Sequence, residues 1–166
     1  MAKYTAPWMT VAYEAIGTRE TPGNRNTSKI MDWAKMLELT KDYTADSVPW
    51  CGLFVAYAMG QIGLEPVKNP LWALNWKGYG KGLDNPAFGC IMCFVRNGGG
   101  HVGFYVGEDS LNYMILGGNQ SDEVSITRVA KKRCVAYRWP PGMDKFLVKG
   151  RIKKSAEEIL VSSNET

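Results

Sequence analysis

The sequence predicts an α+β protein in which helices come first and strands follow. Apolar residues recur at helical spacing up to about residue 63. From Gly89 onward, apolar and β-branched stretches alternate with glycine clusters and short polar turns. Helices followed by strands favour one domain with an antiparallel sheet. The 166 residues, 45% of them hydrophobic, are enough for one sizeable core.

Three helices are expected in the first part of the chain. The first spans residues 7–17, and the second spans residues 29–39 with Ser28 as its cap. The third follows Pro49, because proline is tolerated at the start of a helix and not inside it. It is expected to run from residue 51 to about 60–63, and its apolar or small residues predict a buried helix.

Residues 64–88 are expected to form a long irregular loop with at most one short helix, at 71–76. Prolines and glycines interrupt any periodicity there. Long ordered loops often carry binding surface, so Trp72 and Trp76, together with Trp50, are candidates to line a binding groove. The alternative, that these tryptophans are core anchors, stays open because tryptophan is usually largely buried.

Strands and short turns are expected after residue 88. Pro140-Pro141-Gly142 closes this part, which places a domain at residues 1–142 and a peripheral segment at residues 143–166, amphipathic at 156–161. The expected strands are 90–96, 102–106, 113–116, 124–129 and 134–138.

Basic residues gather near the C-terminus. Between Arg128 and Lys154 there are ten lysines and arginines and one acid, Asp144, although the net charge of the chain is only +4. A solvated basic face is the usual explanation, and attraction to a polyanion such as nucleic acid or an anionic envelope polymer is the functional alternative. The chain has neither a long apolar span nor the apolar core of a signal peptide at its N-terminus, so we expect synthesis in the cytoplasm.

Cys51 is the residue around which a chemical site is predicted. It lies in the first turn of the third helix, where free backbone N–H groups and the helix dipole favour a thiolate. The alternative is a small core residue. Cys90 and Cys93 have the spacing of a metal-binding pair, but residues three apart in a strand face opposite sides. With a single histidine, His101, neither a metal nor another cofactor is expected.

His101 is the expected partner of Cys51, and strand register supplies a third residue. If the hairpin after His101 is centred on Ser110, residues whose numbers sum to 220 face one another, so His101 opposes Asn119. Cys51 would then be the nucleophile, His101 the base and later the acid, and Asn119 the residue that orients the imidazole. A slip of one residue would put Gln120 in the place of Asn119.

Four stretches carry a family resemblance: Pro49-Trp50-Cys51, Gly100–Gly107 (GHVGFYVG), Leu116–Gln120 (LGGNQ) and Tyr137–Pro140 (YRWP). They resemble the CHAP and NlpC-type papain-like cysteine hydrolases, in particular their small phage-borne members. Pro7-Trp8-Met9 and Gly17–Gly23 also resemble the first part of those proteins, so the resemblance covers about residues 7–140. It implies N-terminal helices packed on a C-terminal antiparallel sheet, and cleavage of an amide or peptide bond in peptidoglycan through Cys51, His101 and Asn119. These proteins commonly have aspartate where this chain has Cys90.

The sequence therefore predicts a peptidoglycan hydrolase of the phage endolysin type, which reaches the cell wall after release from the cytoplasm. Trp50, Trp72, Trp76 and Gln120 are expected to contact the substrate. The expected partner is bacterial peptidoglycan, with an anionic envelope polymer for the basic segment, no specific nucleic acid, and a monomeric chain. Amidase and endopeptidase activity both stay open.

Other functions also remain open at this point. An interbacterial effector amidase would share the active site and come with an immunity partner. A non-catalytic cell-wall or virion binding protein, or a nucleic-acid binder with strongly salt-dependent affinity, would represent a different class.

Overall fold

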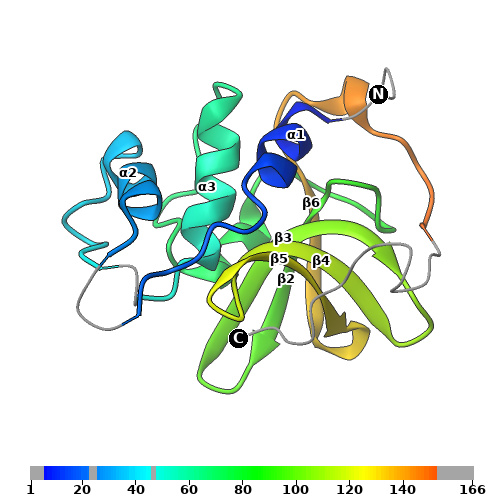
Figure 1. Ribbon diagram of the computed structural model, residues 1–166. Coiled ribbons are helices and arrows are strands. Elements are labelled where there is room, and N and C mark those ends of the chain that lie inside the picture. The colour runs from blue at the N-terminus through cyan, green and yellow to red at the C-terminus, as the bar shows by residue number, and fades with distance from the viewer. Residues whose placement is uncertain (1–5, 23–25, 46–47, 153–166) are drawn as a thin grey trace.

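The computed structural model describes residues 6–22, 26–45 and 48–152, and it confirms the α+β class (Figure 1). The helices α1 (Pro7–Glu14), α2 (Ser28–Met36) and α3 (Cys51–Gln61) come first in the chain. The sheet follows, and α3 packs against its strands while α1 and α2 pack against α3. None of the helices in the described residues is long and apolar enough to cross a membrane.

The helices begin close to where the sequence predicts, but α1 ends early. Beyond Glu14 the chain turns at Gly17, which has a φ of +91°, and its N–H donates to the Val124 carbonyl at 2.9 Å. Pairing with the sheet therefore replaces the last predicted helical turn. In α2, Ser28 is the first helical residue and does not cap the helix. The preceding residue, Thr27, uses its hydroxyl to bond the Arg19 carbonyl at 2.6 Å.

The strands form one antiparallel sheet in the order β1-β6-β2-β3-β4-β5 within the described residues. All five predicted strands are present, and a two-residue strand, β1, was not predicted. A short 3₁₀ helix, η1 (Ala73–Gly78), occupies the region where a short helix is predicted. The strands are β1 (Lys81–Gly82), β2 (Ile91–Arg96), β3 (Gly99–Glu108), β4 (Asn112–Gln120), β5 (Glu123–Ala130) and β6 (Cys134–Trp139), with 3₁₀ turns η2 (Lys131–Arg133) and η3 (Asp144–Phe146).

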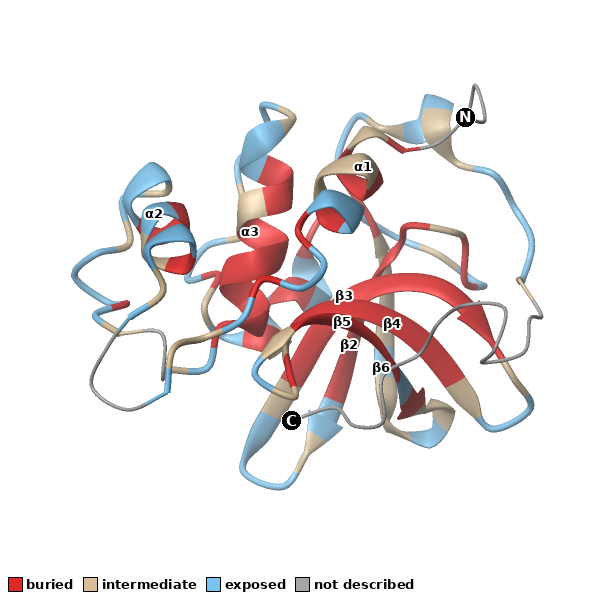
Figure 2. Cartoon of the chain, viewed as in Figure 1, coloured by how far each residue is buried: buried red, intermediate tan, exposed pale blue. Residues whose placement is uncertain are grey.

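The central strands are buried on both faces, as the red strands of Figure 2 show. Neighbouring residues along a strand point to opposite faces. On one face Phe104 contacts Phe54 of α3, with ring centroids 5.9 Å apart. On the other face Tyr105 packs edge-on against Tyr113 at 5.8 Å, and its hydroxyl accepts the Ile152 N–H at 2.9 Å. The helices therefore cover one face, and the chain near residue 152 covers part of the other.

Residues 143–152 pack against the domain, so the packed chain does not end at residue 142 as the sequence analysis expected. Phe146 approaches Trp8 of α1 at 6.4 Å between ring centroids, and the orange segment runs beside α1 in Figure 1. Lys149 pairs with Ala87 in a β-bridge, and the Glu108 N–H donates to the Ile152 carbonyl at 2.8 Å. The rest of the predicted peripheral segment, residues 153–166 with the amphipathic stretch at 156–161, lies outside the described residues.

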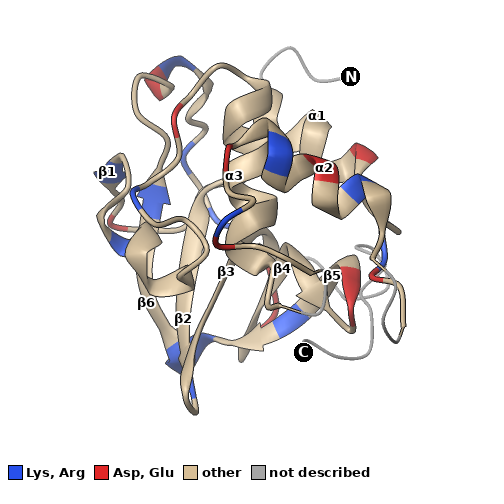
Figure 3. Cartoon of the chain, turned by 90° about the vertical axis from the view of Figure 1, so that its left-hand side faces the viewer, with Lys and Arg blue, Asp and Glu red and all other residues tan. Residues whose placement is uncertain are grey.

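The basic residues of the C-terminal part are spread over several elements, with acidic residues among them (Figure 3). Arg128 pairs with Asp109 at 3.3 Å, and both Lys131 and Arg151 pair with Glu108. These cations are therefore partly neutralised within the protein.

Candidate active site

Cys51 opens α3 at the bottom of a surface groove. It is only 3% exposed, and the loop around Pro70 lies directly against the start of the helix. A Cβ atom added to Gly52 would lie 2.1 Å from the Pro70 carbonyl oxygen, so only glycine permits this approach. The helix N-terminus directs free backbone N–H groups to the space in front of the thiol, where they can stabilise negative charge.

His101 is completely buried on β3 and is held by Gln120 of β4. The His101 Nε2 and Gln120 Oε1 atoms are 2.8 Å apart. The Gln120 amide nitrogen donates to the carbonyl oxygens of Ile115, at 3.1 Å, and Ser125, at 2.6 Å. Because carbonyls only accept hydrogen bonds, the amide oxygen must face the imidazole, and Nε2 must carry the proton. In the neutral ring Nδ1 is then a base, and it is the nitrogen left to face the thiol.

Asn119, the predicted orienting residue, is not the partner of His101, and this prediction is wrong. The predicted register holds at Phe104 opposite Leu116, but it does not continue to His101 and Asn119. Asn119 has a φ of 57°, and the pairing of β4 with β5 shifts by one residue between Gly117 and Gln120. Such a bulge rotates the following side chain. It places Gln120, the alternative for a one-residue slip, against the histidine.

Gly117 gives the histidine and glutamine room to meet. A Cβ atom on Gly117 would lie 2.6 Å from Gln120 Oε1 and 3.4 Å from His101 Nε2. Gln120 itself is fully buried and engaged in this network. Its expected contact with substrate is therefore also wrong, and its position is that of a residue that orients the ring from behind.

The pKa of the Cys51 thiol is lowered from its ordinary value. Burial acts in the opposite direction, but hydrogen bonding to His101 and the positive charge of its ring outweigh it. The Val102 N–H and the charge of Arg96 contribute further lowering. Burial raises the pKa of the other three thiols, to about 12 for Cys90 and Cys93 and about 11 for Cys134. Cys51 alone among the four cysteines is thus prepared to react as a thiolate.

The groove above Cys51 has a volume of about 910 Å³. One wall is the loop 69–73, and another is the β2–β3 turn at residues 96–100. Trp72 stands at the rim with 74% of its surface exposed, which suits its predicted contact with substrate. Two charged side chains, Asp42 and Arg96, also line the groove.

Trp50 and Trp76, predicted to contact substrate, are instead fully buried core residues. The Trp50 indole donates to the Glu20 carboxylate at 3.0 Å. The Trp76 indole donates to the Pro70 carbonyl at 2.9 Å and thereby holds one wall of the groove from behind. The alternative that these tryptophans are core anchors is correct for both.

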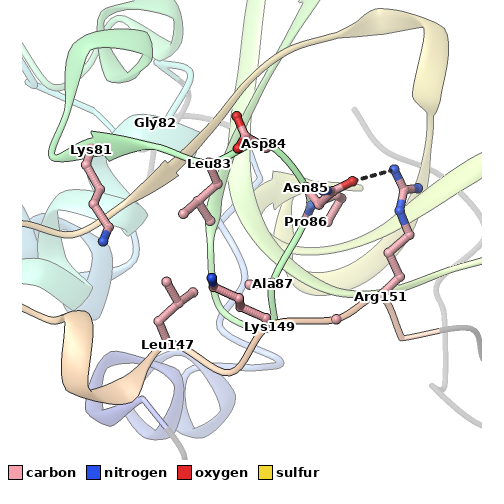
Figure 4. Close-up of a pocket in the computed structure, with 11 residues that line it drawn as sticks. Lys81, Gly82, Leu83, Asp84, Asn85, Pro86, Ala87, Leu147, Lys149 and Arg151 are labelled. Atoms are coloured by element: carbon pink, nitrogen blue, oxygen red, sulfur yellow. Dashed lines mark hydrogen bonds between the residues drawn. The ribbon is translucent and has the colours of Figure 1, made fainter.

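A second cavity, of about 520 Å³, lies between residues 81–87 and residues 147–151 (Figure 4). Its lining includes no cysteine or histidine. Arg151 at its edge is already bonded to Asn85, at 3.5 Å, and to Glu108, at 3.2 Å. No cluster of three or more histidine, cysteine or acidic side chains that could hold a metal ion occurs in the described residues. The groove at Cys51 is therefore the better candidate for chemistry.

Comparison of the sequence with protein-family models gives no match, and comparison with the curated proteins gives none either. The functional conclusion therefore depends on the geometry and chemistry of the residues described above.

Proposed function

We propose that this protein is a cysteine hydrolase that cleaves an amide or peptide bond of bacterial peptidoglycan, as phage endolysins do. The observation that carries the proposal is the contact of Cys51 with a histidine whose opposite nitrogen is fixed by Gln120. A cysteine at a helix N-terminus, packed on an antiparallel sheet that supplies the histidine, is also the arrangement expected for the papain-like hydrolases that the sequence resembles.

The reaction begins with attack of the Cys51 thiolate on the carbonyl carbon of the scissile amide. The oxygen of the tetrahedral intermediate takes up negative charge, and the Cys51 backbone N–H at the helix N-terminus is positioned to donate to it. The imidazolium of His101 gives its proton to the leaving nitrogen, the C–N bond breaks, and a thioester remains. His101 then removes a proton from water, which attacks the thioester and releases the acid and the thiol.

Gln120 assists each of these proton transfers by orienting His101, and it does not itself give or take a proton. Its amide oxygen accepts the Nε2–H of His101, so the ring cannot turn and Nδ1 stays directed at the sulfur. The amide is neutral, so it stabilises the imidazolium less than a carboxylate would, and the ring can return its proton readily. Gln120 thus takes the orienting role that the sequence analysis gave to Asn119.

The groove suits an extended, polar substrate. It is open to solvent above Cys51, has an exposed aromatic ring at its rim in Trp72, and contains charges of both signs in Asp42 and Arg96. A cell-wall peptide joined to a glycan offers a sugar face for the indole and ionised groups for the two charges. Nucleic-acid binding is less well supported, because Arg128, Lys131 and Arg151 are paired with acids.

The test is turnover of purified peptidoglycan by the wild type and by Cys51→Ala, with mass analysis of the soluble fragments. We expect release by the wild type and a loss of at least about a thousandfold in the variant, because the nucleophile is gone. Cys134→Ala is the matched control and should retain full activity, since the pKa of that thiol is raised to about 11. The fragment masses identify the bond. Equal release by Cys51→Ala, or none by the wild type, would contradict the proposal.

A further inference from the structure

Arg96 differs from the other arginines of the described residues because no hydrogen bond or ion pair holds its guanidinium there. Each of the others is engaged by protein. Arg19, Arg128 and Arg151 pair with carboxylates, and Arg133 and Arg138 donate to backbone carbonyls. An arginine that its own protein leaves without a partner, beside a candidate nucleophile, is available to a ligand.

The position of Arg96 directs it to the groove. It is the last residue of β2, lies opposite Gly99 in the β2–β3 register, and lines the same cavity as Cys51. The turn that follows contains Gly98 and Gly99, where an added Cβ atom would meet nothing within 4 Å. These two glycines have no side chain that could cover the guanidinium.

Arg96 is also close enough to the reacting atom to matter for substrate choice, because its charge contributes to the lowered pKa of Cys51. Asp42 is the other charged residue that lines the groove. The groove therefore carries charges of both signs, and the positive charge of Arg96 acts on the thiol.

We propose that Arg96 binds a carboxylate of the substrate beside the scissile amide, and that the enzyme therefore selects peptides with a free carboxylate there over the same peptides carrying a carboxamide. This inference rests on the proposed function. The guanidinium is a planar fork of donors that matches the two oxygens of a carboxylate, whereas a carboxamide offers only one acceptor and no charge.

The experiment uses two synthetic stem-peptide substrates that differ only in one group beside the cleaved bond, a carboxylate in one and a carboxamide in the other. We expect the wild type to prefer the carboxylate by about ten- to a hundredfold in kcat/KM, the range of a charge-assisted hydrogen bond. Arg96→Gln should abolish the preference, mainly by raising KM for the carboxylate peptide. Arg96→Lys should restore part of it. Arg128→Gln makes the same charge change at a distant ion pair and should keep the preference.

A second readout separates substrate binding from tuning of the thiol. The pH dependence of Cys51 alkylation by iodoacetamide, a neutral reagent, reports the thiolate without any carboxylate. If Arg96→Gln slows both peptides equally and moves the alkylation midpoint to higher pH, Arg96 acts only on the sulfur and the inference is overturned. Equal cleavage of both peptides by the wild type overturns the inference alone. Cleavage of neither peptide nor of peptidoglycan overturns the proposed function as well.

Discussion

The two ends of the β3–β4 hairpin both carry a buried polar cluster. They differ in whether the buried group of the cluster can still gain or lose a proton. At one end Glu108 is 2% exposed, accepts the Tyr105 hydroxyl at 2.8 Å, and is paired with Lys131 and Arg151. At the other end His101 is fully buried and is held by Gln120. A one-residue register shift lies near each cluster.

The difference is that the partners of Glu108 include two cations, whereas the partner of His101 is a neutral amide. Burial opposes ionisation of Glu108, but its hydrogen bonds to Lys131 and Tyr105 and the charges of Lys131 and Arg151 outweigh this and lower its pKa. The carboxylate is thus fixed in its charged form and holds the chain near Ile152 to the sheet. The neutral Gln120 amide instead fixes only one nitrogen of His101 and leaves the ring free to gain or lose a proton. A buried group is suited to catalysis when its partners orient it without locking its charge.

The largest effect is expected from breaking the His101 end. Gln120→Leu keeps the volume but removes the acceptor, so we expect kcat to fall about a hundredfold, at the low end of what positioned acid–base catalysis contributes. The imidazolium also loses its partner, so the pKa of Cys51 should rise and the midpoint of its alkylation by iodoacetamide should move to higher pH. A merely structural role for Gln120 would not move that midpoint.

The control for this variant is Ser125→Ala, which removes a hydroxyl from the same network and leaves the Ser125 carbonyl that holds the glutamine amide at 2.6 Å. It should keep both kcat and the alkylation profile. Unchanged kinetics in Gln120→Leu would show that the amide does not orient the histidine.

A smaller effect, on stability and not on chemistry, is expected at the Glu108 end. Glu108→Gln should lower the free energy of unfolding at pH 7 by about 2 kcal/mol, since hydrogen bonds to a charged group are lost in a buried site. A carboxyl whose pKa is lowered by folding contributes stability above its unfolded pKa of about 4.3 and loses this contribution as the pH falls through its folded value. The difference between wild type and variant should therefore be constant near neutrality and shrink below about pH 4.

Urea unfolding at pH 7, 5 and 3 measures this difference. Asp144→Asn is the control, because Asp144 forms an ion pair with Lys81 at the surface, 68% exposed, and such pairs contribute about 0–1 kcal/mol. An equal loss for Glu108→Gln at all three pH values would indicate lost packing and not lost charge.

The parts of the site that depend on local pattern could be predicted from the sequence. Pro49 and the apolar run after Cys51 place a helix N-terminus at the nucleophile. The alternation of β3 and β4 predicts a strand directly after His101 and gives the correct pairing of Phe104 with Leu116. These features follow from residues that are neighbours in the chain, so one sequence contains them.

The parts that the sequence analysis missed depend on a bulge and on tertiary contacts. Register arithmetic assumes an uninterrupted ladder, whereas Ser121 and Asp122 both have positive φ and form a tight turn directly after the bulge at Asn119. Two glycines followed within four residues by asparagine, serine and aspartate were a signal for this irregularity. The burial of Trp50 and the exposure of Arg96 to the groove depend on distant segments, which local patterns do not specify.

The smallest effect is expected at Asn119 itself. It distinguishes a role of Asn119 in forming the bulge from a role of its side chain in the reaction. If Asn119 serves only to form the bulge, Asn119→Gly should keep kcat within about twofold, because glycine adopts a φ near 57° without strain. Asn119→Val should lose about 1–2 kcal/mol of stability and displace Gln120, because a β-branched residue is strained in the left-handed region. Peptidoglycan turnover measures kcat of the two variants, and urea unfolding measures their stability. Both are compared with the values for Gln120→Leu. A loss of kcat in Asn119→Gly as large as that in Gln120→Leu would mean that the Asn119 side chain takes part in the reaction after all.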